Sequence, residues 1–253
     1  MRKLTLATLV AAAVALPIAM SSSSRAQDAA PAIEPQAKAL LDAMSARLAG
    51  AKSLSFNART TYDVPTAHKT PVFLTTVSDV AFKRPASLRV ATAGDGPATV
   101  FVADGKKMGR YDQAAGTLAS KDAPQTIDAL VRAAGEHGLD LPFADVLLDK
   151  PFGDLSKGVT SAFVVGQSSV VGGTLTNIVS VADGTSHMQI WIGAQDNLPR
   201  QLVVSESKDG QTTRNMVVYS NWRVNPLVAE SLFSSSARGK VRQVELKPVT
   251  PID

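Results

Sequence analysis

Apolar residues first recur at the spacing of an α-helix, close to the N-terminal end of the chain. The spacing i, i+3, i+4, i+7, i+11 is met by Ala37, Leu40, Leu41, Met44 and Leu48. Gly50 stands where the C-terminal cap of such a helix is expected. The pattern predicts an amphipathic helix of about four turns, and its apolar stripe has to cover another surface.

Alternating apolar and polar residues follow this helix and predict antiparallel strands. The segments are rich in Thr, Val and Phe, and Pro, Gly and Asp-Gly stretches separate them. Asp104-Gly105 is typical of a tight hairpin turn. The pattern predicts roughly ten strands, which fall within residues 55–64, 73–82, 87–92, 99–103, 107–111, 159–171, 174–182, 186–193, 200–206, 212–223 and 240–247.

Helical spacing returns only once, between residues 124 and 154. An apolar stripe is formed by Ile127, Leu130, Val131 and Ala134. Thr126 precedes this stripe as a suitable N-cap, and Gly138 ends it. Pro142 then opens a shorter helix that runs through Leu148. Helices at two places in a chain of strands predict an α+β fold, with a large curved antiparallel sheet partly closed over helices.

Residues 1–26 have the composition of a cleaved signal peptide. Arg2 and Lys3 form a basic region, residues 4–20 are apolar, and Ser24-Arg25-Ala26 places small residues where a signal peptidase reads them. The alternative is a retained membrane anchor, but the apolar run is short for a span and contains Pro17. We therefore predict cleavage after Ala26, a flexible leader over residues 27–35, a single domain over residues 36–253, and a periplasmic protein without stable membrane insertion.

Composition narrows the choice of function further. Of the 253 residues 45% are hydrophobic and 19% charged, and none is Cys, which excludes a disulfide framework, a thiol nucleophile and the acylated Cys of a lipoprotein. Cleavage after Ala26 would remove three basic residues and no acidic one, so the formal charge of +4 would fall to +1. Because no basic run with interleaved aromatic residues remains, we predict no nucleic-acid binding.

Six groups of segments in a fixed order distinguish this chain: KRP and SLR (83–85, 87–89), FVADGKKMGRYD (101–112), TIDAL (126–130), LPFADVLL (141–148), VGQSSVVGGTL (165–175), and MQIWI with NLPRQLVV (188–192, 197–204). In these segments the chain resembles a family of predicted periplasmic proteins with no assigned activity and, more distantly, the lipoprotein-localisation-factor (LolA-like) superfamily. The resemblance implies an unclosed half-barrel whose concave apolar face is covered by helices and accommodates acyl chains. Where the carriers end in a Phe-x-Phe and Pro-Gly stretch, this chain has Phe233 followed by SSSARGK.

A cavity of this kind would be lined by large apolar side chains from the strands. The candidates for ligand binding are Phe56, Phe82, Phe101, Tyr111, Phe163, Trp191 and Trp222. The alternative for these residues is an ordinary hydrophobic core, since aromatic residues in strands are mostly buried against neighbours.

The sequence lacks the common enzyme signatures. It contains no Gly-x-Ser-x-Gly elbow, Walker A loop, Rossmann glycine fingerprint or His-Glu-x-x-His motif. His68, His137 and His187 lie far apart in the sequence, so we predict no metal site, cofactor or catalytic residue.

Four acidic and two basic positions have alternative interpretations. Asp140, Asp145 and Asp149 could act as acid and base, or form a solvated helix face near Lys150. Asp104 is best explained by its turn, because an Asp side chain bonds the backbone of its own turn. Arg84 and Arg89 bound a strand; they could meet an anionic headgroup or an acidic partner, or be solvated or paired.

Three functional hypotheses follow. The first is a non-enzymatic periplasmic carrier that binds a lipid, an acylated protein or another hydrophobic ligand in the half-barrel. The second is an interaction or sensor module that contacts another envelope protein through an exposed sheet edge. The third is an enzyme that uses the carboxylates of residues 140–149.

Overall fold

The computed structural model describes residues 32–64, 66, 70–96, 98–139, 141–152, 158–208, 211–234 and 241–244. The chain divides into two compact units, Met1–Ala30 and Pro31–Asp253, and the described residues all belong to the second. The predicted signal peptide, its cleavage site and residues 27–31 of the predicted leader lie outside the described residues. Among the helices that are described, none has the length and apolar composition needed to cross a membrane.

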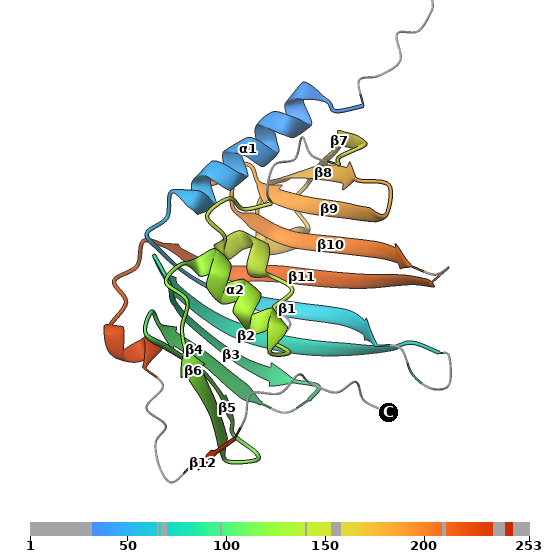
Figure 1. Ribbon diagram of the computed structural model, residues 1–253. Helices are drawn as coiled ribbons and strands as arrows, with labels where there is room; N and C mark the ends of the chain where they lie inside the picture. The colour runs from blue at the N-terminus through green and yellow to red at the C-terminus, as the bar shows by residue number, and fades with distance from the viewer. Residues whose placement is uncertain are drawn as a thin grey trace, which may run out of the picture. The chain divides into compact units, whose positions relative to one another are not determined.

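One large curved sheet forms a half-barrel, and helices cover its concave face (Figure 1). The α-helices are α1 (Pro35–Ala49) and α2 (Ile127–Glu136), and the 3-10 helices are η1 (Ala144–Leu147), η2 (Val171–Gly173) and η3 (Glu230–Phe233). The strands are β1 (Ser53–Val64), β2 (Val72–Lys83), β3 (Ser87–Gly94), β4 (Thr99–Asp104), β5 (Lys107–Asp112), β6 (Thr117–Asp122), β7 (Ser161–Ser168), β8 (Thr176–Ala182), β9 (Ser186–Gly193), β10 (Pro199–Lys208), β11 (Gln211–Val224) and β12 (Arg242–Gln243).

The sheet has twelve described strands in the order β12-β6-β5-β4-β3-β2-β1-β11-β10-β9-β8-β7. Neighbours pair antiparallel except β12, which runs parallel to β6. Strands β1 to β6 form one meander and β7 to β11 another, and the two join where β1 pairs with β11. The α2–η1 segment connects the meanders, so it crosses the concave face at the middle of the chain (Figure 1).

Helix α1 confirms the first predicted helix. Pro35 occupies its first turn, where a missing N–H costs nothing, and the backbone N–H of Gly50 donates to Ala46 O at 3.0 Å. The ordered chain starts before Gln36, however, because Ile33 forms a parallel bridge with Ala162. Residues 32–35, assigned to the leader by sequence, thus take part in the fold.

The two helices predicted in the middle of the chain differ in outcome. Helix α2 is confirmed, and Thr126 is its N-cap, because the Thr126 hydroxyl accepts a hydrogen bond from the Ala129 N–H at 3.3 Å. The segment 142–148 forms only the single 3-10 turn η1. Its buried side chains, Val146 and Leu147, point into the core from this one turn.

Most predicted strands are confirmed, with three differences. Strand β6 was not predicted, strand β7 ends at Ser168 instead of continuing to Val171, and of the predicted strand 240–247 only β12 is described as a strand. The six residues of β6 carry no alternating pattern, because Thr117, Leu118 and Ala119 are all buried.

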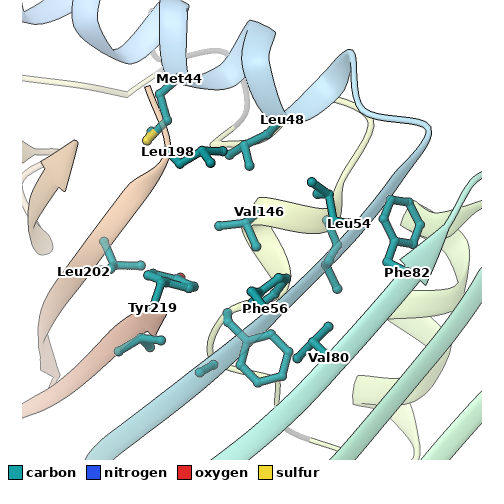
Figure 2. Packing of buried hydrophobic residues seen from close by; sticks show 14 of the residues in the cluster. Met44, Leu48, Leu54, Phe56, Val80, Phe82, Val146, Leu198, Leu202 and Tyr219 are labelled. Atoms are coloured by element: carbon teal, nitrogen blue, oxygen red, sulfur yellow. The ribbon is translucent and has the colours of Figure 1, made fainter. Parts of the chain in front are cut away.

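The two faces of the sheet have different partners. Leu54, Phe56 and Ala58 of β1 point to the concave side and are buried, while Ser55, Asn57 and Arg59 between them point to the convex side. Met44 and Leu48 of α1 and Val146 of η1 pack on the concave side chains, among them Phe56, Phe82 and Tyr219 (Figure 2). The main core therefore lies between the concave face and its helices.

A smaller apolar contact lies on the convex face. Phe233 of η3 is fully buried, and it lies outside the main core cluster. Outward-facing Ala81 and Val102 of the adjoining strands are buried as well, and Lys83 pairs with Glu230 beside them. The C-terminal segment thus covers the convex side of β3 and β4.

Candidate functional site

Four aromatic rings meet in the interior of the half-barrel. Phe56 of β1 contacts Phe143, Tyr219 and Trp222, at ring-centroid distances of 5.9, 5.9 and 4.4 Å. Tyr219 also stacks on Trp222 at 5.6 Å, and the Trp222 indole N–H donates to Pro199 O at 2.8 Å. These contacts join the central strands β1 and β11 to the residue that precedes η1. Each of the four rings packs against at least one other ring of the cluster.

An interior pocket lies beside this wall, between η1 and strands β10 and β11. Its volume is about 210 Å³, and it is lined by Leu141, Pro142, Asp145, Leu202, Val204, Glu206, Asn215 and Val217. The strand residues alternate along β10 and β11, so their side chains share the concave face. Apolar walls with a few polar groups are the usual composition of small-molecule sites.

Two ionisable groups near the pocket are desolvated. Burial raises the pKa of the Asp145 carboxyl. Burial also raises the pKa of the Tyr219 phenol, with a smaller contribution from the negative charge of Asp145. The Tyr219 hydroxyl has no hydrogen-bond partner among the described residues, and the same holds for the Thr60 hydroxyl. Both hydroxyl groups could therefore form a further hydrogen bond inside the apolar core.

The structure places the seven predicted ligand-binding residues on different faces. Phe56, Phe82, Phe101 and Trp222 point to the concave interior, where they belong to the core cluster or pack against it. Tyr111, Phe163 and Trp191 alternate with concave residues and therefore lie on the convex side. Phe163 is 43% exposed there. None of the seven is among the residues that line the pocket beside η1.

The titratable residues considered from sequence are brought into separate environments. Asp145 lies within the 3-10 turn and Asp149 lies two residues after its end, where it pairs with Arg84. His137 Nδ1 lies 2.8 Å from Ala133 O, and His187 Nε2 lies 2.8 Å from the Ser180 hydroxyl. His68 and Asp140 lie outside the described residues. Within the described ranges no three His, Asp or Glu side chains come together as a metal site.

Asp104 has the turn role that its sequence indicates. Its Oδ1 accepts hydrogen bonds from the backbone N–H groups of Lys106 and Lys107, both at 2.8 Å. These bonds, that of Lys107 foremost, hold the pKa of the Asp104 carboxyl below its usual value. The side chain thus closes the β4–β5 hairpin.

The two arginines that bound β3 differ in their partners. Arg84 donates to Ala51 O at 3.0 Å and to Leu148 O at 3.1 Å, and it pairs with Asp149. It therefore ties the end of η1 to the end of α1 and to β2. Arg89 lies on the convex face, away from this network.

Of the residues that line the pocket, sequence analysis considered only Asp145, and it also missed Phe143 and Tyr219 of the aromatic cluster. A partial signal was present, because Asn215, Val217 and Tyr219 alternate along one predicted strand and must share a face. Which face they share depends on the strand pairing, and the sequence of β11 alone does not define it.

The chain matches the family described as "Predicted periplasmic protein (DUF2092)" over residues 37–247, and it belongs to this family. No curated protein matches it. Solved structures with a similar chain course include the MucA/MucB complex of Pseudomonas aeruginosa, at 16% identity and TM-score 0.46 over 83% of this chain and 64% of that one. LprF from Mycobacterium bovis matches at 17% identity and TM-score 0.45, over 78% and 97%. A LolA superfamily protein from Nitrosomonas europaea matches at 9% identity and TM-score 0.34, over 79% and 97%. Likenesses at this distance assign neither a ligand nor a partner.

Proposed function

We propose that this member of the DUF2092 family is a non-enzymatic periplasmic protein that binds a hydrophobic ligand, a lipid or the acyl chain of an acylated protein, inside the half-barrel. The observation that carries the proposal is the pocket on the concave side, where Leu202, Val204 and Val217 of β10 and β11 lie together with the polar residues Asp145, Glu206 and Asn215. An amphiphile fits this combination, because its chain contacts the apolar side chains and its polar end contacts the polar ones.

The ligand enters by replacing part of the cover. The pocket of about 210 Å³ is smaller than the roughly 300–1,000 Å³ of most ligand sites. On one side it is lined by Leu141, Pro142 and Asp145, and the same segment sends the buried side chains of Phe143, Val146 and Leu147 into the core. An acyl chain that displaces these side chains exchanges one apolar contact for another, and each further Å² that it buries adds about 25 cal/mol.

The periplasmic location is part of the proposal. The family description is that of a predicted periplasmic protein, and residues 1–26 have the composition of a signal peptide. The chain has no Cys that could be acylated. Export followed by cleavage would release the half-barrel domain into the periplasm.

The first experiment is native mass spectrometry of the mature protein, purified from a periplasm without detergent, followed by organic extraction. A stoichiometric lipid or acylated peptide is the expected result. A protein that is empty and takes up neither added fatty acid nor the apolar fluorophore N-phenyl-1-naphthylamine would refute the proposal.

Adjacent valines on β10 offer a matched pair of variants. Val204 lines the interior pocket, while Val203 is equally half-buried but points to the convex face. Val204→Phe fills the pocket, so we expect fluorophore affinity to fall about tenfold, the equivalent of about 1.4 kcal/mol. Val203→Phe is expected to leave the affinity unchanged. Equal effects of the two substitutions would place the binding site elsewhere.

A second function, contact with another envelope protein, is favoured by the outer edge of β7. Residues 32–34 pair with this edge only as far as Val164, whose N–H donates to Glu34 Oε2. Phe163 and Val165 expose 43% and 51% of their surface beside it. An apolar strand edge of this kind accepts an added strand from a partner. A protein that copurifies in stoichiometric amounts, is lost on Val165→Lys and is retained on Val204→Phe would favour this function over the carrier.

A further inference from the structure

A large hollow lies on the convex face, opposite the helices. It has a volume of about 640 Å³, within the usual range of small-molecule sites. Most of its lining residues are outward-facing residues of the four central strands β11, β1, β2 and β3, and the inward-facing Phe56, Val80 and Trp222 of the same strands complete the lining. It shares no polar side chain with the interior pocket.

Register explains why the sheet is hollowed at this point. Arg223 pairs with Ser55, Ser55 pairs with Ala81, and Ala81 pairs with Arg89, so these four residues form one row across four strands. Two small side chains therefore lie between two arginines. Neighbouring strands are about 4.8 Å apart, so the row offers a floor two strands wide, with a guanidinium group on each side.

A chain of amides forms the neighbouring row. The Asn221 Nδ2 donates to Asn57 Oδ1 at 2.6 Å, and Asn57 Nδ2 donates in turn to Asp79 Oδ1. Asn221 stands in a β-bulge with φ 55°, a conformation that Asn tolerates better than most residues. The bulge turns Trp222 to the concave aromatic cluster and leaves the Asn221 amide in the hollow.

The charges in the hollow are unbalanced. The side chains of Arg89 and Arg223 form no hydrogen bond or ion pair with any described residue, whereas those of Arg84 and Arg200 both have carboxylate partners. Asp79 is the acidic residue that lines the hollow, and its carboxylate accepts from Asn57. Two unpaired guanidinium groups thus face one carboxylate that is already hydrogen-bonded.

We propose that this hollow binds a small phosphorylated ligand, with the phosphate held between Arg89 and Arg223. Guanidinium groups bind oxyanions through paired N–H donors, and a phosphate carries enough charge and enough acceptor oxygens for two of them. The amide of Asn221 is placed to donate to the same ligand. This site goes beyond the proposed hydrophobic ligand, because it lies on the other face of the sheet.

The test is an NMR titration of the arginine Nε–Hε signals with inorganic phosphate at low ionic strength. We expect the signals of Arg89 and Arg223 to shift together along one binding curve. Arg89→Gln and Arg223→Gln are each expected to lower phosphate affinity about tenfold, since each removes charge-assisted hydrogen bonds. Asp79→Asn is expected to raise the affinity, because it removes the negative charge and keeps an acceptor for Asn57.

Arg59→Gln is the matched control. Arg59 is an exposed arginine of the same face of β1, outside the hollow, so its substitution removes the same charge and is expected to change affinity less than about twofold. An equal loss in Arg59→Gln, or no saturable shift in the wild-type protein, would overturn the proposal. These residues are on the surface, and an unchanged circular dichroism spectrum confirms that the variants fold.

Two probes identify the source of the phosphate. Glycerol 3-phosphate represents a free solute, and vesicles of phosphatidylglycerol in phosphatidylcholine represent a lipid headgroup. Binding of the solute alone supports a soluble ligand; arginine-dependent binding of vesicles supports a headgroup. Val204→Phe leaves the hollow intact, so phosphate binding that persists in this variant separates the two sites even if the hydrophobic ligand is never found.

Discussion

The two faces of one sheet have opposite designs, although the same strands build both. The concave face is apolar where α1, α2 and η1 pack on it and its aromatic side chains touch there, while its polar residues Glu206 and Asn215 line the pocket beside η1. The convex face is polar over its centre, where small residues separate Arg89 from Arg223, and it is covered by η3 only at one side. Period-two alternation allows a strand to serve both faces, so the sheet supplies stability on one side and charged recognition on the other.

The two faces also differ in the kind of polar group that has no bonding partner. On the concave face it is a hydroxyl group, that of Tyr219, which sits in an apolar and desolvated place. On the convex face it is charge, in the two guanidinium groups. A hydrophobic ligand with one polar end suits the first, and an anionic ligand in contact with water suits the second.

The largest expected effect is a loss of stability, and it compares the main core on the concave face with the smaller apolar contact on the convex face. Phe82 on the concave face and Phe233 on the convex face are both fully buried. We expect Phe82→Ala to cost about 3–5 kcal/mol of unfolding free energy, because it leaves a cavity in the main core. Phe233→Ala is expected to cost less, within about 0.5–3 kcal/mol, because η3 can undock without global unfolding.

Urea denaturation of both variants, with the slope m compared between them, measures these losses. Phe82→Leu and Phe233→Leu are the matched controls, since each keeps most of the apolar volume. If the two alanine variants lose the same free energy of unfolding, the convex contact unfolds together with the main core and the two regions do not differ in stability.

How far the sequence predicts this architecture depends on the range of the interactions. The helix cap at Thr126 and the turn at Asp104 were predictable, because each is decided by contacts within three residues. Strand β6 was not predictable, because its residues are covered on both sides and show no alternation. Its outer edge pairs with β12, from the C-terminal part of the chain and far away in sequence.

Both sites depend on pairings that no local pattern reveals. In the segment around Trp191, apolar residues occupy both faces, so hydrophobicity does not tell that Ile190 and Ile192 face the core and Trp191 does not. Asp145 and Tyr219 meet only because η1 crosses to the second meander. The row from Arg223 to Arg89 joins four strands and exists only once their register is known.

A second prediction concerns the Asp145 carboxyl on the concave side and its effect on stability as pH changes. Burial raises the pKa of Asp145 in the native state above its ordinary value of 3.8. As pH rises from that value, the unfolded chain releases its proton before the native protein does, so this group makes stability fall until the raised native pKa is passed. Asp145→Asn removes this loss. We expect the variant to be more stable than the wild type at pH 7, by less than the loss caused by Phe82→Ala.

Denaturation curves from acidic to neutral pH check both the sign and the window. The difference between Asp145→Asn and the wild type should be small near pH 3.8 and should grow as pH rises. Asp149→Asn is the control, because Asp149 is exposed and pairs with Arg84. A variant at position 145 that is less stable at pH 7 would show that the carboxylate is bound and needed in the interior.

The smallest expected effect concerns Asp104, which lies in a turn outside both faces and serves as a reference for the losses predicted above. Asp104→Ala removes two hydrogen bonds from the exposed β4–β5 turn, and we expect a loss of about 0.5–1.5 kcal/mol. Asp104→Asn keeps an acceptor oxygen and should lose less.

The backbone N–H groups lower the native pKa of Asp104. The contribution of this carboxylate to stability is therefore present above the ordinary pKa of 3.8 and disappears as pH falls through the lowered value. Urea denaturation at pH 7 and at pH 3 checks this. A difference between Asp104→Ala and the wild type that persists undiminished at the lower pH would show that the turn depends on packing instead of on the charge of the carboxylate.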